Sequence, residues 1–568
     1  MQAVAKLDQL DHAWKAEGSV YVLRNVTVEG LAPFIKLPAY RQNLRLNVTF
    51  SDYDTYQQDL LDPASRFHES RHDLVVLALW LDTLAMAFDG RDALQAEAVF
   101  DHVQNVVAQI KQHTDAPIAI NTFLPPFHHQ DEWCPLPGLA ALNQRLRDAA
   151  TSDGQLLLVD FDRLLGTIGM KQGLDRRYWF RFKAPAGPAF LQAWGRKLAQ
   201  AVASLKGLSR KVLILDCDNT LWGGVIGEDG LAGIQLSPHD YPGNVYHAFQ
   251  RQVLALQQQG ILLALCSKNN EDDVFAVMRD HPDCIIRHEH LAGWRINWQD
   301  KAANLIALAE ELRLGLDSFV FIDDSPTECD RIRQSLPEVA VLQVPSAIHE
   351  LPSLLQEFQG FMTLTLSAED QVRTELYQLE RQRRQVSAPH GDLADFVASL
   401  ALKASIGEAR IEELARVAQL TQKTNQFNLT TRRYSESEIG HLAADPESLV
   451  LIMKVADTYG EYGLTGVAIA RRESSGIHVD TFLLSCRILG RQLETVFLRE
   501  VLALAAGRWG PQPVRAEFIR TAKNDQVATF FDNHAFVRDG GDTQHQHYVL
   551  PELPIQPPIP YITVVRRA

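Results

Sequence analysis

The chain has 568 residues, of which 46% are hydrophobic and 22% are charged, as is usual for globular proteins. This length exceeds what one hydrophobic core organises, so two to four domains are expected. A formal net charge of −15 argues against nucleic acid as the main partner, and no apolar run reaches the ~18 residues of a membrane span.

Six cysteines are scattered along the chain without any C-x-x-C pair, so neither a cysteine zinc site nor a disulfide framework is indicated. The N-terminus also lacks an apolar leader headed by Lys or Arg. We therefore expect reduced thiols and a cytoplasmic location.

The first segment, residues 1–205, alternates short apolar runs with amphipathic stretches such as 92–113. This alternation predicts an α/β domain with a parallel sheet. The expected strands lie within 19–28, 43–50, 72–81, 116–124 and 154–161.

The second segment, residues 206–348, has the pattern of a doubly wound parallel sheet. Strands are expected within 211–218, 261–268, 284–288 and 318–324, and helices within 245–259, 271–280 and 300–313.

The third segment, residues 365–568, mixes helices and strands without alternating them strictly. Helices are expected at 367–385, 409–422, 491–506 and 524–533, and strands at 448–457, 462–472, 476–486 and 513–520. The amide-rich stretch 421–434 is typical of a surface loop, although its Arg432 and Arg433 could meet an acidic partner. The proline-rich end, 551–564, predicts an extended tail outside the sheet centre.

Polar groups follow three of the strands expected in the second segment, and a lysine opens one of its helices. Because parallel strands end at one edge of a sheet, these groups should meet there. Several carboxylates cannot share a small cleft cheaply, and oxygen ligands favour Mg²⁺ as the compensating cation. The groups are Asp216, Asp218, Ser267, Lys268, Lys301, Asp323 and Asp324.

Only 46 residues separate Thr220 from Ser267, and about 14 of them belong to an expected helix. The rest suffices for a glycine-rich flap but not for a separate cap domain. Such a site stays open to a bulky substrate, such as a group carried by a protein.

These residues resemble the four motifs of the haloacid-dehalogenase-like (HAD) phosphotransferase superfamily, beginning with D-x-D-x-T as "DCDNT". The resemblance implies that Asp216 is the nucleophile and Asp218 the general acid/base. It also implies that Thr220, Ser267, Lys268 and Lys301 hold the phosphoryl group. Asp216, the backbone carbonyl of Asp218 and one of Asp323 or Asp324 would hold Mg²⁺.

The residues that flank these motifs resemble a narrower group of proteins than the whole superfamily. "LDCDNTLWGGVIGEDG", "YPGNVYHAFQ", "INWQDKAANL" and "LTQKTNQFNLTTRRY" resemble the FkbH-like family. This resemblance implies transfer of a glyceryl unit from 1,3-bisphosphoglycerate, with dephosphorylation, to the phosphopantetheine thiol of an acyl carrier protein for polyketide-type biosynthesis. It covers nearly the whole chain and is least distinctive over the first 200 residues.

Cys217 lies between the two carboxylates of the first motif, and two interpretations stay open. Beside Mg²⁺ and Lys301 its thiol could have a depressed pKa and attack an acyl phosphate. Alternatively, it is a small buried residue that fills the strand end, as free cysteines often do.

The third segment resembles the acyl-CoA N-acyltransferase (GNAT) fold. Its loop after the expected strand 476–486 matches the family's phosphate-binding loop at Arg487 and Gly490, but Gln492 replaces the final small residue, which makes ordinary CoA binding doubtful. The same loop could receive a carrier's phosphopantetheine, which implies a site of Cys486, Arg487, Gly490, Arg491 and Asn524.

The first domain resembles SGNH-hydrolase or flavodoxin-like α/β regions but lacks the nucleophilic Gly-Asp-Ser block, so we expect docking rather than hydrolysis. Two other functions remain open for the whole chain. One is a Mg²⁺-dependent phosphatase acting on a protein or sugar phosphate, and the other is a non-catalytic scaffold that binds a carrier protein.

Overall fold

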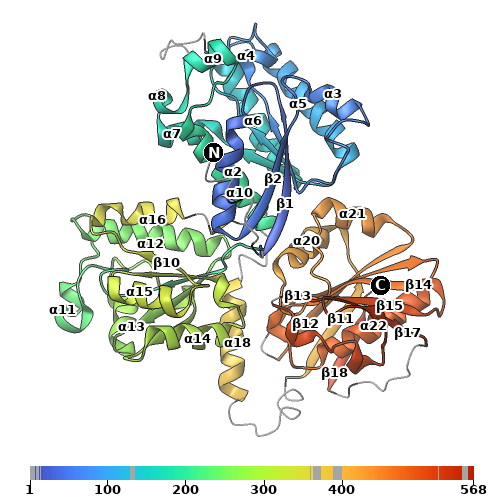
Figure 1. The fold of residues 1–568 in the computed structure, drawn as a ribbon. Coiled ribbons are helices and arrows are strands. Elements are labelled where there is room, and N and C mark those ends of the chain that lie inside the picture. The colour runs from blue at the N-terminus through green and yellow to red at the C-terminus, as the bar shows by residue number, and fades with distance from the viewer. Residues whose placement is uncertain are drawn as a thin grey trace. The chain divides into compact units, whose positions relative to one another are not determined.

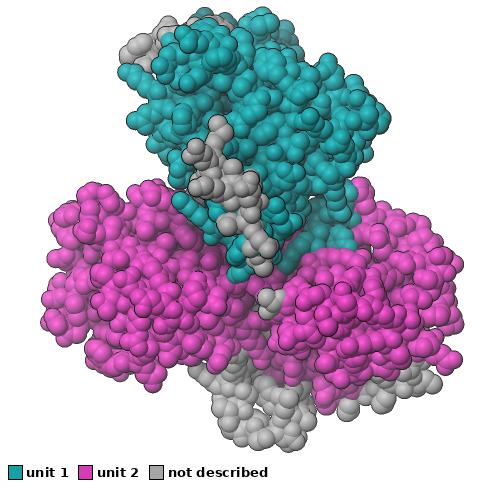
Figure 2. All heavy atoms as spheres, in the orientation of Figure 1, with its two compact units in different colours: residues 1–208, 433–439 teal, residues 209–432, 440–568 magenta. Residues whose placement is uncertain are grey.

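The computed structural model describes residues 7, 12, 14–127, 135–358, 360–362, 373–387, 400–458, 460–521, 523–552, 559 and 561–567, without the side chains of 380, 382–387 and 486. It divides into two compact units (Figure 2). Residues 1–208 and 433–439 form unit 1, and residues 209–432 and 440–568 form unit 2. None of the described helices is long and apolar enough to cross a membrane.

Unit 1 contains a five-stranded sheet of order β2-β1-β3-β4-β5, parallel throughout as predicted (Figure 1). Its strands are β1 Ala16–Arg24, β2 Leu44–Phe50, β3 Leu74–Ala78, β4 Ile118–Asn121 and β5 Leu156–Val159. Its helices are α2 Ala32–Arg41, α3 Tyr56–Leu61, α4 Leu81–Leu84, α5 Ala93–His113, α6 Pro137–Ser152, α7 Phe161–Ile168, α8 Met170–Gly173, α9 Arg176–Phe182 and α10 Pro188–Leu205.

The first sheet of unit 2 is also parallel, with the order β10-β9-β6-β7-β8. Alternate residues of β6 enter separate cores on its two faces, Leu213 and Leu215 on one and Val212 and Ile214 on the other. Its strands are β6 Val212–Leu215, β7 Leu262–Ser267, β8 Leu291–Ile296, β9 Phe319–Asp323 and β10 Ala340–Gln343. Its helices are α11 Ile226–Gly233, α12 Gly243–Gln258, α13 Glu271–Asp280, α14 Lys301–Leu312, α15 Pro326–Ser335 and α16 Leu351–Glu357.

The strand predicted at 284–288 is wrong, because the edge strand β8 lies further along the chain. Cys284 and Ile286 are buried, which explains the strand-like pattern. However, the backbone N–H groups of Ile285 and Ile286 donate to the side-chain oxygen of Gln250 rather than to a neighbouring strand.

Helix α18, Arg373–Ser387, packs on the first sheet of unit 2, although the sequence pattern placed it with the third segment. Its Tyr377 lies in the same core as Phe319 and Phe321, and Gln378 Nε2 donates to the backbone oxygen of Leu291 at 2.9 Å. Residues 363–372, where this helix was expected to begin, lie outside the described residues.

The second sheet of unit 2 is mixed, with the order β16-β17-β15-β14-β13-β12-β11-β18. The helix predicted at 524–533 is instead two short 3₁₀ turns, Asp525–Val527 and Asp532–His534. The strands are β11 Leu402–Glu408, β12 Ser448–Asp457, β13 Gly460–Glu473, β14 Gly476–Leu484, β15 Val514–Ile519, β16 Val537–Gly541, β17 His545–Leu550 and β18 Ile562–Arg566. The helices are α20 Leu414–Lys423 and α22 Leu493–Trp509, while α21 Glu436–Ala444 begins in unit 1 and ends in unit 2.

The stretch predicted as a surface loop, 421–434, is partly buried between two strands. β14 and β15 pair only at Ile477–Val479, and beyond that point the segment Phe427–Leu429 fills the space between them. Leu429 N donates to Phe482 O of β14, and Ile519 N of β15 donates to Leu429 O. The backbone of this segment therefore pairs with both strands inside the sheet.

A buried carboxylate, Glu413, fastens α20 to the end of the chain. Its oxygens accept hydrogen bonds from Arg567 at 3.0 and 3.1 Å and from Lys454 at 2.7 Å. Burial raises the pKa of Glu413, but these cationic donors outweigh it and lower that pKa from 4.5 to about 2. The stability it contributes is present above its unfolded pKa and is lost as the pH falls through its folded pKa.

Glu413→Gln is therefore expected to lower the free energy of unfolding at neutral pH by about 2–3 kcal/mol. The difference from the wild type should shrink as the pH falls from about 4.5 toward 2 in urea titrations. Glu408→Gln is the matched control, because Glu408 forms a largely exposed ion pair with Arg508 at 3.1 Å. This substitution should lower the free energy of unfolding by less than about 0.5 kcal/mol. Equal losses in the two variants would contradict the prediction.

Candidate active site

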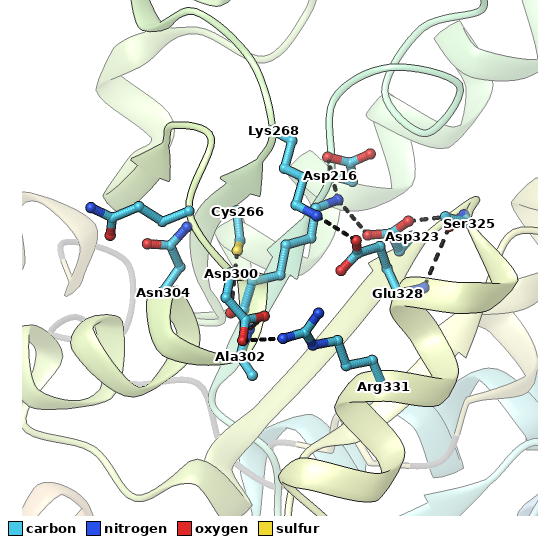
Figure 3. Close-up of polar contacts among 12 residues, drawn as sticks. Asp216, Cys266, Lys268, Asp300, Ala302, Asn304, Asp323, Ser325, Glu328 and Arg331 are labelled. Atoms are coloured by element: carbon cyan, nitrogen blue, oxygen red, sulfur yellow. Dashed lines mark hydrogen bonds and ion pairs between the residues drawn. The ribbon is translucent and has the colours of Figure 1, made fainter.

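Asp216 follows β6 directly, at the carboxyl end of the central strand of the first sheet of unit 2. Its backbone N–H donates to Ile322 O of β9 at 3.0 Å, which fixes the residue against the neighbouring strand. Its side chain is buried, and Figure 3 shows it beside Asp323, which ends β9. The carboxylates predicted to lie close together at the strand ends therefore do so.

Lys301 forms an ion pair with both carboxylates from the first position of α14. Asp300 caps the helix by accepting from Ala302 N at 3.1 Å, which aims the next side chain into the site. Lys301 Nζ lies 2.6 Å from Asp323 Oδ2 and 3.0 Å from Asp216 Oδ1. Burial lowers the pKa of Lys301, but the two carboxylates outweigh it and raise that pKa, so the ammonium is held charged.

Asp216, Asp323 and Asp324 each offer a carboxylate oxygen within 4.8 Å of the others. Burial and the charges of Asp216 and Asp323 raise the pKa of Asp324 to about 6, and burial and Asp216 raise that of Asp323. One ammonium therefore does not balance the carboxylates at this edge. An all-oxygen donor set with excess negative charge fits Mg²⁺.

Asp218 is held by three hydrogen bonds. Its Oδ1 accepts from Trp222 Nε1 at 2.9 Å and from Ile226 N at 3.1 Å, and its Oδ2 accepts from Asn269 Nδ2 at 2.8 Å. Sequence reasoning missed Trp222 and Asn269 as positioning residues. The signal was their closeness to the motifs, since Trp222 stands four residues after Asp218 and Asn269 two after Ser267.

The other predicted phosphate-binding residues lie around the same strand ends. Ser267 is buried at the end of β7, and Thr220 is buried with a hydroxyl that has no hydrogen-bond partner among the described residues. Lys268 is more exposed, and its ammonium pairs with Glu328 at 2.7 Å (Figure 3).

Cys217 has no exposed surface and packs in one of the two cores of this sheet. Burial raises the pKa of its thiol well above the ordinary value, Asp216 adds to this effect, and a hydrogen bond with Ser267 opposes it. The protein groups around this thiol therefore raise its pKa instead of lowering it. The geometry favours the second interpretation, a small residue filling the strand end.

The chain between the first motif and α12 forms a short flap rather than a domain. An antiparallel bridge joins Gly223 to Gln235, and α11 lies within the loop that it closes. Asn219 Oδ1 accepts from Gly224 N at 3.0 Å, where a positive φ of 93° requires glycine. Figure 1 shows α11 standing apart from the sheet.

The loop predicted to bind pantetheine begins where β14 ends. Arg487 is buried and its Nε donates to Ser485 Oγ at 3.2 Å, whereas the guanidinium of Arg491 contacts Tyr462. Gly490 has a positive φ of 75°. The side chain of Cys486 lies outside the described residues.

Asn524 lies in the segment that follows β15. It is fully buried, and its Nδ2 donates to the backbone oxygens of Asn428 and Ile519, both at 2.9 Å. It thereby holds the Phe427–Leu429 segment in the sheet.

A cavity of about 340 Å³ within unit 2 adjoins Arg487 and lies between its two sheets. Seven of its nineteen described lining residues are Lys or Arg, against 55 of 568 in the whole chain, and one is a carboxylate, Asp317. The cations from the first sheet and α18 are Lys211, Arg313 and Arg373. Those from the second sheet and its helices are Arg416, Lys423, Arg487 and Lys523.

One solved structure resembles a large part of this chain. It is the N-terminal part of the protein BF1531 from Bacteroides fragilis, described as containing a phosphatase domain complexed with Mg. At 22% identity and a TM-score of 0.57, the likeness covers 62% of this chain and 95% of that chain. The chain shares that fold over this part.

Two acetyltransferase structures match a smaller part of the chain. The ribosomal-protein-S18-alanine N-acetyltransferase from Escherichia coli is 12% identical, with a TM-score of 0.21, over 27% of this chain and 96% of that chain. The PaiA N-acetyltransferase from Thermoplasma acidophilum, in complex with coenzyme A, is 14% identical, with a TM-score of 0.19, over 26% and 98%. No family model matches the sequence, and no curated protein matches it.

Proposed function

We propose that this protein removes a phosphate from 1,3-bisphosphoglycerate and transfers the glyceryl unit to the phosphopantetheine thiol of an acyl carrier protein. The observation that carries the phosphoryl half is the ion pair of Asp216 with the buried Lys301, within a cluster of strand-end carboxylates. The Mg complex of the similar phosphatase domain from Bacteroides fragilis supports this half. The resemblance of the sequence to the FkbH-like family supports the acyl half.

In the phosphoryl step, a carboxylate oxygen of Asp216 attacks phosphorus and the bond from phosphorus to the substrate oxygen breaks. Asp218 supplies the proton for that leaving oxygen and later accepts one from the water that hydrolyses the aspartyl phosphate. Its bonds to Trp222 and Asn269 hold it in position. Lys301 offsets charge on the phosphoryl oxygens. Mg²⁺, held by Asp216, Asp218, Asp323 and Asp324, would supply further charge stabilisation when bound.

In the acyl step, the carrier thiol attacks the carbonyl carbon of the acyl phosphate. A carbon–sulfur bond forms, the bond from that carbon to the phosphate oxygen breaks, and inorganic phosphate leaves while the thiol proton passes to solvent. The step needs no thiol from this chain, in agreement with the burial of Cys217. The cation-rich cavity beside Arg487 supports phosphopantetheine binding, because guanidinium and ammonium groups bind phosphate esters.

The decisive experiment gives the protein Mg²⁺, 1,3-bisphosphoglycerate and a phosphopantetheinylated carrier, and then follows the intact mass of the carrier and the release of phosphate. A carrier heavier by one glyceryl group, formed only with the enzyme, supports the proposal. Phosphate release without a loaded carrier would leave the second candidate, a phosphatase acting on a protein or sugar phosphate, which the open, flap-only site also favours.

Cys217→Ala is expected to keep both phosphate release and carrier loading within about threefold of the wild type, because its thiol is sealed in the core. Cys266→Ala is the matched control, since Cys266 is also fully buried at a strand end. Loss of loading in Cys217→Ala alone, with phosphate release retained, would show that Cys217 accepts the acyl group.

A further inference from the structure

Four ionisable side chains gather on one face of the second sheet of unit 2. Glu517 of β15 stands opposite His547 of β17 in the antiparallel register, and His545 lies two residues away on the same face. His478 belongs to β14, on the other side of β15, where it stands opposite Arg515. Three adjacent strands thus bring three imidazoles around one carboxylate.

The distances approach those of a metal site. His545 Nε2 lies 3.2 Å from Glu517 Oε2, and His478 Nε2 lies 3.5 Å from Glu517 Oε1. Ligand atoms of Glu517, His545 and His547 all lie within 4.8 Å of one another. Two ligands of a tetrahedral Zn²⁺ ion are about 3.3 Å apart when each bond is 2.0–2.1 Å, so small side-chain rotations would bring the three into range.

The residues around these side chains form hydrogen bonds of the kind that orient metal ligands. Arg432 donates to Glu517 Oε2 at 2.7 Å and also pairs with Asp480 at 2.9 Å, so it orients the carboxylate. Two carboxylates against this one guanidinium leave a net negative charge for a cation. His547 has no hydrogen-bond partner among the described residues, and the centroid of its ring lies 4.4 Å from that of His545, with the two ring planes tilted by 42°.

We propose that Glu517, His545 and His547 form a Zn²⁺ site, with a fourth position open to water or to His478. Two imidazoles and a carboxylate are typical zinc ligands, whereas the all-oxygen cluster at Asp216 fits Mg²⁺. The chain therefore separates two classes of divalent cation between the two sheets of unit 2. Zinc at this position joins β17 to β15 and stabilises that side of the second sheet.

The test titrates Co²⁺, a spectroscopic substitute for Zn²⁺, into the full-length protein freed of metal and kept in excess Mg²⁺ to occupy the all-oxygen cluster. We expect one equivalent to bind with the visible absorption of four-coordinate cobalt, without a sulfur charge-transfer band, and one equivalent of Zn²⁺ to displace it. Zn²⁺ should also raise the melting temperature.

The double variant His545→Ala/His547→Ala should weaken Co²⁺ binding at least about 100-fold and remove the rise in melting temperature. The matched control His239→Ala/His349→Ala removes two exposed imidazoles from elsewhere and should bind like the wild type. Circular dichroism checks the fold of each variant, and Glu517→Gln provides a second, milder test. Absence of stoichiometric binding in the wild type, or binding that the double variant retains, overturns the proposal.

Discussion

Asp216→Asn should reduce phosphatase turnover by at least about 10³-fold, because an amide oxygen does not replace the carboxylate as the attacking group. Lys301, which lies 3.0 Å from Asp216, would keep its second partner Asp323, so the variant should still fold. The measurement is phosphate release under saturating Mg²⁺, with circular dichroism to check the fold.

The matched control is Asp300→Asn. Asp300 caps α14 and pairs with Arg331 at 2.8 Å on the exposed side of the helix (Figure 3). Asparagine also caps helices well, so this variant should keep turnover within about threefold. A covalent phosphoenzyme trapped by intact mass in Asp218→Asn, but never in Asp216→Asn, would assign the nucleophile. Undiminished release in Asp216→Asn would mean that the nucleophile is another residue.

Lys301→Met should cause the largest loss of stability. Its ammonium is buried with the carboxylates of Asp216 and Asp323. Removing one partner of a buried ion pair leaves uncompensated charge, which costs about 3–5 kcal/mol. Urea unfolding in a chelator should show this loss, and Mg²⁺ should restore part of it, because a divalent cation can balance the same carboxylates.

Lys268→Met is the control for this prediction. Lys268 makes one ion pair, with Glu328, and its side chain is 38% exposed. Its replacement should cost less than about 1 kcal/mol, with no added response to Mg²⁺. Equal losses for the two lysines, or a loss in Lys301→Met that Mg²⁺ leaves unchanged, would contradict the charge balance described for the site.

The sequence by itself determined the parallel sheets and the position of the carboxylate cluster. Continuous apolar runs mark strands that are buried on both faces, and residues that follow such runs must meet at one edge. Asp216, Asp323 and Lys301 could therefore be assigned before any contact was known. The helix 271–280 was also predicted with its observed bounds, because its apolar periodicity and flanking residues are local signals.

Only the tertiary structure decided how ambiguous segments are used. The apolar stretch 284–288 has the pattern of a strand. However, its backbone N–H groups donate hydrogen bonds to the side chain of Gln250, which lies over thirty residues earlier. The many Asn and Gln side chains of 421–434 are typical of a surface loop. The backbone of part of that stretch nevertheless pairs with both β14 and β15. Judged from its sequence neighbours alone, Cys217 could be reactive or buried, and packing in one core of the first sheet of unit 2 leaves it no exposed surface. Each outcome depends on partners distant in the sequence, which local patterns do not encode.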